Sequence, residues 1–154
     1  WLMELARFAD LVYTPIIDTK EYPAGVDAVL VEGAVANEDN LEMIHKVRNN
    51  TRWLISFGDC AVTGNVTALR NPLGKALPVL ERSFVELSNL RPGIPDEPGI
   101  LPRLLDRVLP IHQVVKVDAY MPGCPPPAER IRLALEAIRD GRLPELEGHN
   151  IKFG

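Results

Sequence analysis

The chain has 154 residues, enough for one ordinary domain with a buried core, and its 46% hydrophobic and 25% charged residues are those of a soluble globular protein. Its 17 basic and 21 acidic residues leave a net charge of −4 without any basic run, which argues against nucleic acid and anionic membranes as partners. The apolar runs are too short to span a bilayer, and no signal peptide is visible, so we expect a cytoplasmic protein without membrane insertion.

The first half of the chain alternates helical patterns with short apolar runs. Apolar residues recur at helical spacing over 2–9, and residues 11–13 predict a short strand. The runs 28–31 and 53–57 are continuous and apolar, as is typical of strands buried on both faces of a parallel sheet. Between these two runs, an N-cap asparagine followed by periodic apolar residues predicts a helix over 37–50.

The second half has weaker patterns. Residues 77–87 predict a helix or a pair of helices. Residues 90–102 contain four prolines and two glycines, so we expect an irregular surface crossing that does not divide the domain. Three further elements are expected in chain order: a short helix at 104–108, a strand at 114–117 and a helix at 128–140.

This alternation of strands and helices predicts an α/β fold with a mainly parallel sheet flanked by helices. Ligands of such folds bind beyond the carboxyl ends of the strands. Cys60 follows the strand expected at 53–57, and Cys124 lies in the loop that follows the strand expected at 114–117. Glu32 directly follows the apolar run 28–31. We therefore expect Glu32 and both cysteines at one edge of the sheet.

The two cysteines lie in loops that are typical of metal-cluster ligands. Cys124 is in the sequence Pro-Gly-Cys-Pro-Pro-Pro, where glycine permits close approach of the backbone and the prolines fix the loop. A cysteine followed by proline recurs in iron–sulfur proteins. Cys60 has a glycine on either side, in Gly-Asp-Cys-Ala-Val-Thr-Gly, which lets the chain turn sharply around a bulky ligand. Alone, this second pattern also fits a buried structural cysteine.

Two cysteines do not complete a common metal site, because an iron–sulfur cluster or a structural zinc takes four ligands. The histidines at 45, 112 and 149 have no ligand spacing to either cysteine, which argues against zinc. The chain starts at Trp1 rather than methionine, so we expect a missing piece before it. The remaining ligands would lie there, in a partner, or nowhere. No phosphate-binding glycine loop or nucleophile motif is present in the sequence.

Four motifs occur in order along the chain: Val31-Glu-Gly-Ala-Val-Ala-Asn-Glu38, Gly58-Asp-Cys-Ala-Val-Thr-Gly-Asn-Val66, Leu69-Arg-Asn-Pro72 and Met121-Pro-Gly-Cys-Pro-Pro126. Together they resemble the small subunit of cytoplasmic NAD-reducing nickel–iron hydrogenases, in the NADH:ubiquinone oxidoreductase 20 kDa subunit superfamily. The resemblance implies one flavodoxin-like iron–sulfur domain over 1–154 that lacks its first strand and the ligand loop after it. In that family four cysteines hold a proximal 4Fe–4S cluster. Two lie in an N-terminal Cys-x-x-Cys loop, and the other two correspond to Cys60 and Cys124.

The resemblance also implies partners and roles. The nickel–iron centre would belong to a hydrogenase large subunit, so this chain would hold no catalytic residue. It would pass electrons to iron–sulfur/flavin diaphorase subunits that carry FMN and reduce NAD. Glu32 could move protons or contact a subunit, or could be an acid stabilised at a helix N-terminus. Asp59 fits a loop-capping carboxylate. Arg70 could form a salt bridge across the subunit interface or be solvated.

Three other functions stay open. The cluster-bearing subunit of respiratory complex I shares the Pro-Gly-Cys-Pro loop, but has adjacent cysteines in its N-terminal motif. A flavin-binding or scaffolding flavodoxin-like module would need a phosphate-binding loop, normally after the first strand. A thiol-redox protein is disfavoured because no Cys-x-x-Cys is present. The segment before Trp1 would distinguish the first two from a hydrogenase subunit.

Overall fold

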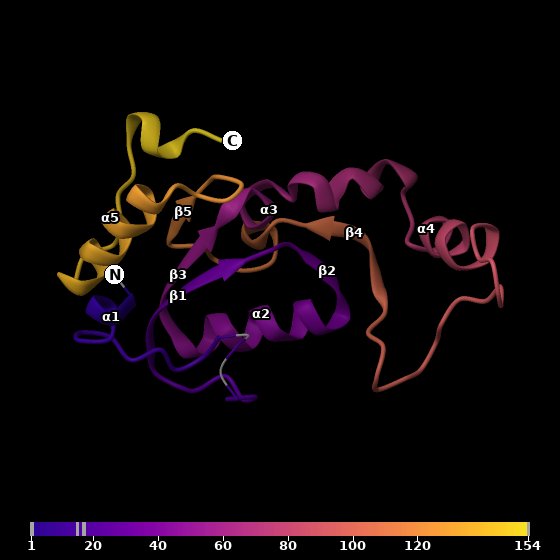
Figure 1. Ribbon diagram of the computed structural model, residues 1–154, viewed down its shortest axis with the longest axis horizontal. Helices are drawn as coiled ribbons and strands as arrows, with labels where there is room; N and C mark the ends of the chain where they lie inside the picture. Colours follow the sequence, from indigo (N-terminus) through magenta and orange to yellow (C-terminus); the bar gives the residue numbers. More distant parts are fainter. Residues whose placement is uncertain (1, 15, 17, 154) are drawn as a thin grey trace.

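The computed structural model describes residues 2–14, 16 and 18–153 of the chain (Figure 1). Its α-helices are α1 (Leu2–Leu5), α2 (Glu38–Asn50), α3 (Gly58–Thr63), α4 (Leu77–Glu81) and α5 (Ala128–Arg139). Its strands are β1 (Val26–Glu32), β2 (Val35–Asn37), β3 (Thr51–Phe57), β4 (Leu104–Leu109) and β5 (Ala119–Met121). Three segments are 3₁₀ helices, η1 (Asn65–Leu73), η3 (Ile111–Gln113) and η4 (Gly148–Ile151). A fourth, η2 (Arg82–Glu86), is a π-helix. Trp1 lies outside the described residues.

A three-stranded parallel sheet in the order β1-β3-β5 forms the centre of the molecule. The expected α/β fold with a parallel sheet is therefore confirmed. Because β3 lies between the other two strands, its residues 54–56 are almost completely buried. Successive residues of a strand point to opposite faces, so each face of β3 contributes to a different core.

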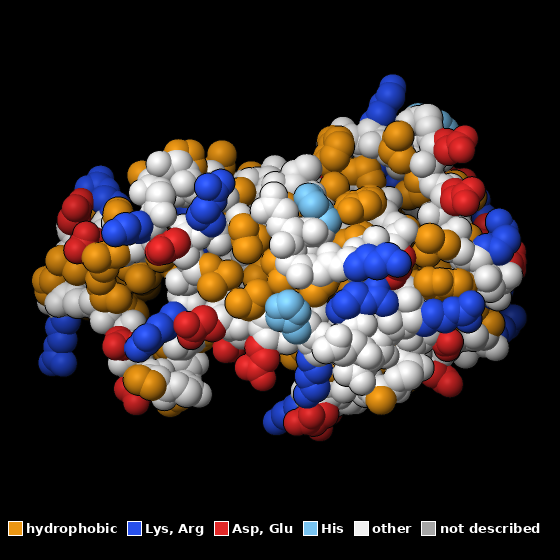
Figure 2. Space-filling model, turned by 180° about the vertical axis from the view of Figure 1, so that it is seen from behind, with side chains coloured by type: hydrophobic (Ala, Val, Ile, Leu, Met, Phe, Trp, Pro, Cys, Tyr) orange, Lys and Arg blue, Asp and Glu red, His pale blue; other side chains and the backbone are white. Residues whose placement is uncertain are grey.

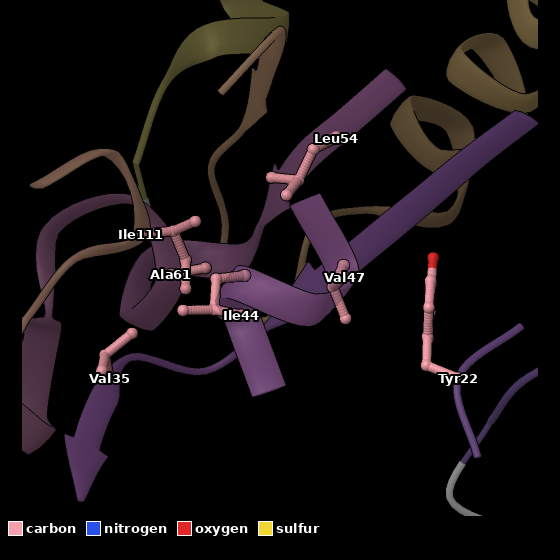
Figure 3. Packing of buried hydrophobic residues seen from close by; sticks show 7 residues of the cluster. All are labelled: Tyr22, Val35, Ile44, Val47, Leu54, Ala61 and Ile111. Atoms are coloured by element: carbon pink, nitrogen blue, oxygen red, sulfur yellow. The ribbon is translucent and has the colours of Figure 1, made fainter. Parts of the chain in front are cut away.

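The two faces of the sheet are covered by different helices (Figure 1). On one face, Leu54 belongs to a core with residues of α2 and α3; its buried members are Tyr22, Val35, Ile44, Val47, Leu54, Ala61 and Ile111. Figure 3 shows Ile44, Ala61 and Ile111 close together in this core. On the other face, Ile55 packs with Ala119, Met121 and Ala134 of α5. Burial on both faces explains why these strands read as continuous apolar runs.

The helix expected at 37–50 is confirmed as α2, and its N-cap is the predicted one. The side chain of Asn37 accepts a hydrogen bond from the backbone N–H of Asn40 at 2.8 Å. The helix expected at 128–140 is confirmed as α5. The helix or pair of helices expected at 77–87 is confirmed as α4 and η2, which follow each other directly and extend from the body of the molecule with the next, irregular segment (Figure 1). We call residues 77–103 the arm.

Three expected elements are wrong. Residues 11–13 form no strand, and the expected strand at 114–117 follows η3 as irregular chain, with β5 beginning only at 119. The helix expected at 104–108 is the strand β4, which pairs antiparallel with β2, a strand that we did not expect. A run of five residues is too short for its periodicity to separate helix from strand, so pairing with β2 decides its conformation.

None of the helices in the described part of the chain is long and apolar enough to cross a bilayer.

Asp118, just before β5, connects that strand to β3 and α2. Its Oδ2 accepts hydrogen bonds from the backbone N–H of Leu54 at 2.8 Å and from Nη1 of Arg48 at 2.5 Å. Burial raises the pKa of Asp118. The hydrogen bonds from Leu54 and Arg48, together with the charges of Arg48 and Lys116, lower this pKa by a larger amount. The net effect holds the pKa of this carboxyl below its ordinary value. The ionised form is therefore favoured by folding.

We expect Asp118→Asn to lower the free energy of unfolding at pH 7 by about 1–2 kcal/mol, because it removes a charge-assisted hydrogen bond. A carboxyl whose pKa is lowered by folding stabilises the protein above its unfolded pKa, and this contribution disappears as the pH falls through the folded pKa. The difference between wild type and variant should therefore shrink below about pH 4. Urea denaturation at several pH values measures it. Glu21→Gln, which breaks the exposed Lys46–Glu21 pair, is the control and should cause no change. A difference that grows as the pH falls would contradict the prediction.

Candidate functional site

The three parallel strands end together at one edge of the sheet. Glu32, the last residue of β1, is opposite Phe57, the last residue of β3, and Phe57 is opposite Met121, the last residue of β5. Cys60 lies three residues after Phe57, and Cys124 lies three residues after Met121. The structure therefore places Glu32 and both cysteines where the sequence predicted, at the carboxyl edge that parallel sheets use for ligands.

Cys60 lies in a short helix rather than in the expected loop. The helix α3 begins at Gly58, directly after β3, and the φ angle of Gly58 is +82°, which favours glycine. Gly64 ends the helix in a left-handed conformation, and its N–H donates to the carbonyl of Cys60 at 2.9 Å. The side chain of Cys60 is half-buried. The two glycines thus produce the sharp turns predicted from the sequence, and the chain between them is helical.

Cys124 is exposed, but the residues just before it are buried. Gly123 has a φ angle of +135°, and a Cβ atom there would lie 2.5 Å from the Cα of Pro126. No other residue type fits this position without moving the backbone. The peptide bond between Cys124 and Pro125 is cis.

Asp59 joins the two cysteine-bearing segments. Its backbone N–H donates to the carbonyl of Gly123 at 3.0 Å, and its Oδ1 accepts from the N–H of Gly123 at 2.5 Å. Asp59 is only 8% exposed. The sequence predicted a loop-capping carboxylate, and the structure shows that the loop it caps is the one that carries Cys124. Each cysteine directly follows one member of this hydrogen-bonded pair.

Arg130 anchors the same loop from the other side, and sequence reasoning missed it. It is 5% exposed and lies in α5, where its Nη1 donates to the carbonyl of Pro122 and, at 3.0 Å, to that of Lys152. Its Nη2 donates to the carbonyl of His149 at 3.0 Å. Arg130 precedes the buried Ala134 by four residues, so an arginine on the apolar face of the expected helix was the available signal.

The structure excludes one of the suggestions for Glu32 and gives Arg70 contacts that the sequence did not suggest. Glu32 is exposed at the end of a strand, so it is not an acid at a helix N-terminus. Arg70 is half-buried and donates to three backbone carbonyls, those of Ala36 at 3.2 Å, Leu105 at 2.7 Å and Asp106 at 3.2 Å. It therefore connects η1 to β2 and β4 through backbone carbonyls, contacts that the sequence did not suggest.

The two thiols are the only cysteines of the sequence, and both are free. No group of three or more histidine, cysteine, aspartate or glutamate side chains within residues 2–14, 16 and 18–153 could hold a metal ion. Thiolate ligands favour iron–sulfur clusters, zinc and copper(I). The two cysteines lie on segments joined by hydrogen bonds, and they number two of the four thiolates that an iron–sulfur cluster takes.

Comparison with known proteins places this arrangement in context. Residues 1–138 match the model of the family described as NADH ubiquinone oxidoreductase, 20 Kd subunit. The chain is 38% identical over 147 residues to a subunit of the F420-non-reducing hydrogenase vhu of Methanocaldococcus jannaschii, and the match covers 94% of this chain and 50% of that protein. It is 36% identical over 145 residues to the NAD-reducing hydrogenase HoxS subunit delta of Cupriavidus necator, with 92% and 68% covered.

A solved structure of an NAD+-reducing [NiFe]-hydrogenase in the H2-reduced state superposes on this chain with a TM-score of 0.91. The two chains are 35% identical, and the match covers 99% of this chain and 85% of that one. The chain spans about half the length of its relatives from F420-non-reducing hydrogenases.

Proposed function

Because the chain belongs to the NADH ubiquinone oxidoreductase 20 Kd subunit family, we propose that it is the electron-transfer small subunit of a nickel–iron hydrogenase. In this proposal Cys60 and Cys124 supply two of the four thiolates of a 4Fe–4S cluster. The observation that carries the proposal is the pair of hydrogen bonds between Asp59 and Gly123, which holds the two cysteine-bearing segments together at the sheet edge. A cluster bound there would supply one-electron transfer. The other two ligands would come from another segment or chain.

The hydrogenase relatives favour this function over that of a respiratory complex I subunit. Both relatives named above are hydrogenase subunits, and the superposed structure is a nickel–iron hydrogenase. The further proposed partner is a diaphorase with iron–sulfur clusters and FMN that reduces NAD. We place the assembly in the cytoplasm, without nucleic acid, and treat residues 1–154 as one iron–sulfur domain.

The surface also fits a chain that works within an assembly. Exposed apolar side chains follow one another along η1 and into the arm; they include Val66, Leu69, Leu73, Leu77, Leu87 and Leu90. Figure 2 shows hydrophobic side chains gathered over the arm, at the left of that view. Contiguous exposed apolar residues mark interaction surfaces in soluble proteins. Burial of these side chains against other subunits would remove them from water.

The test of the proposal is purification of the chain from its source under anaerobic conditions, with whatever subunits remain bound. We expect a complex that contains both nickel and iron, shows an iron–sulfur EPR signal and oxidises hydrogen. A nickel-free complex with quinone-reductase subunits would instead identify a complex I subunit. A flavin on this chain without iron would identify a flavodoxin-like module. Either of these results would overturn the proposal.

A further inference from the structure

We propose that Asp59 is a positioning residue that sets the spacing between Cys60 and Cys124. Its carboxylate accepts a hydrogen bond from the loop that carries Cys124, beyond the point where β3 and β5 pair through their backbones. The spacing of the two thiols follows from contacts within this chain. Its relevance to a cluster rests on the function proposed above.

The need for a side chain arises from the geometry of the strand ends. The strands β3 and β5 pair as far as Phe57 and Met121. Beyond that pair β3 turns directly into α3, whose carbonyls point along the helix axis and bond within or just after the helix. The N–H of Asp59 still donates to Gly123, as in a continued ladder. The N–H of Gly123 donates to the side-chain Oδ1 of Asp59 and not to a backbone carbonyl of α3.

The loop that carries Cys124 has few other ways to be held. Residues 122–127 are Pro-Gly-Cys-Pro-Pro-Pro, and the four prolines have no backbone N–H. Only Gly123 and Cys124 can donate from this stretch, and Asp59 accepts from the first of them. Two carbonyls of the loop accept hydrogen bonds: that of Gly123 from the backbone N–H of Asp59, and that of Pro122 from Nη1 of Arg130. Asp59 therefore satisfies both backbone groups of the residue before Cys124.

Asp59 is the second residue of α3, a position where a carboxylate often serves only its own helix. Here the carboxylate reaches a residue 64 positions away along the chain. Because Cys60 and Cys124 each follow a member of this pair by one residue, a change in the pair moves the two thiols relative to each other. This makes Asp59 a determinant of thiol geometry and not simply of helix stability.

The decisive experiment compares Asp59→Leu and Asp59→Asn with wild type in the full chain without bound iron. Dibromobimane, which fluoresces when both of its arms have reacted, reports whether Cys60 and Cys124 can be bridged. Leucine has no acceptor, and loss of a hydrogen bond to a charged group shifts the balance between a held and a released loop by about tenfold or more. We therefore expect the rate of bridging to fall, by up to that factor. Asparagine keeps an oxygen at the same place and should retain most of the wild-type rate. Asp39→Leu changes the second residue of α2, an exposed aspartate, and is the matched control.

Two outcomes would overturn the proposal: a Leu variant that bridges at the wild-type rate, or an Asn variant that loses bridging as the Leu variant does. Should the Leu variant not fold, hydrogen exchange of the Gly123 amide in wild type gives the answer, because the proposal requires that amide to be protected and rapid exchange would refute it. Reconstitution of the variants with ferrous iron and sulfide in the intact complex adds the EPR signal as a second readout. A chain that passes the bridging test but binds no cluster would disprove the proposed function and leave the role of Asp59 in thiol spacing intact.

Discussion

Cys60→Ala and Cys124→Ala are each expected to remove the iron–sulfur EPR signal from the anaerobically purified complex. Each substitution deletes a thiolate that no other residue of the chain can replace, because the sequence contains only two cysteines. Loss of a group that merely orients a ligand commonly weakens metal binding by about 10–100-fold. Loss of the ligand itself should exceed that, so bound iron attributable to this cluster should fall to background. EPR and iron analysis of the complex measure the effect.

The stability of the Cys124→Ala variant should separate the loss of a ligand from the loss of the fold. The side chain of Cys124 is exposed, so its replacement should change the free energy of unfolding of the iron-free chain by less than about 0.5 kcal/mol. Val62→Ala, in the same helix as Cys60, is the control and should leave the EPR signal unchanged. If both cysteine variants retained the full cluster content, Cys60 and Cys124 would not be ligands.

The sheet edge could be predicted from the sequence because its determinants are local. The apolar runs that became β1 and β3 are continuous and bounded by polar or glycine residues, and each ends just before a residue of interest. Once these runs are assigned to parallel strands, the rule that ligands bind at the carboxyl edge places Glu32, Cys60 and Cys124 together. No contact between distant residues was needed for that step.

The elements that were wrong depend on pairing between distant parts of the chain. The strand β4 reads as a short helix until β2 is available as its antiparallel partner. Residues 114–117 carry three valines typical of a strand. These side chains instead lie in irregular chain after η3 and pack against the core that contains Leu54. Here tertiary packing overrides local β-propensity. The short strand β5 is therefore found two residues beyond the apolar run that suggested it.

The hydrogen bonds within the site could not be predicted either, because they also depend on the pairing of distant segments. Asp59 and Gly123 meet because β3 and β5 share a register, and a sequence pattern cannot state a register between strands separated by more than 60 residues. The role of Arg70 depends on the position of the β2–β4 pair, which was not expected. Residue types at the site were therefore predictable, whereas the bonds between them were not.

Gly123→Ala is expected to have the largest effect on stability. At φ +135° an alanine is strained, and its Cβ would meet three backbone atoms: Pro126 Cα at 2.5 Å, Pro126 N at 2.8 Å and Pro125 O at 3.0 Å. No flexible side chain is available to move aside. We expect the free energy of unfolding to fall by about 3 kcal/mol or more, and cluster binding to be lost in the complex. Urea denaturation of the full chain measures the first effect.

Gly25→Ala separates the steric effect from backbone strain alone. Gly25 also has a positive φ angle, of +72°, but a Cβ there would have no atom within 4 Å. This control should lower the free energy of unfolding by only about 1 kcal/mol. Equal losses at the two positions would show that the tight packing around Gly123 is not important for stability.

Because both backbone groups of Gly123 bind Asp59, substitutions at the two positions should not act independently. A Cβ at Gly123 that displaces its peptide groups already breaks the hydrogen bond from the Gly123 N–H to Oδ1 of Asp59, which is the bond that Asp59→Leu removes. The loss of stability in the double variant should therefore be smaller than the sum of the single losses by about 1 kcal/mol or more. Losses that add to within about 0.5 kcal/mol would mean that the two residues stabilise the fold separately. In that case the hydrogen bonds between them would not be what holds the cysteine-bearing segments together.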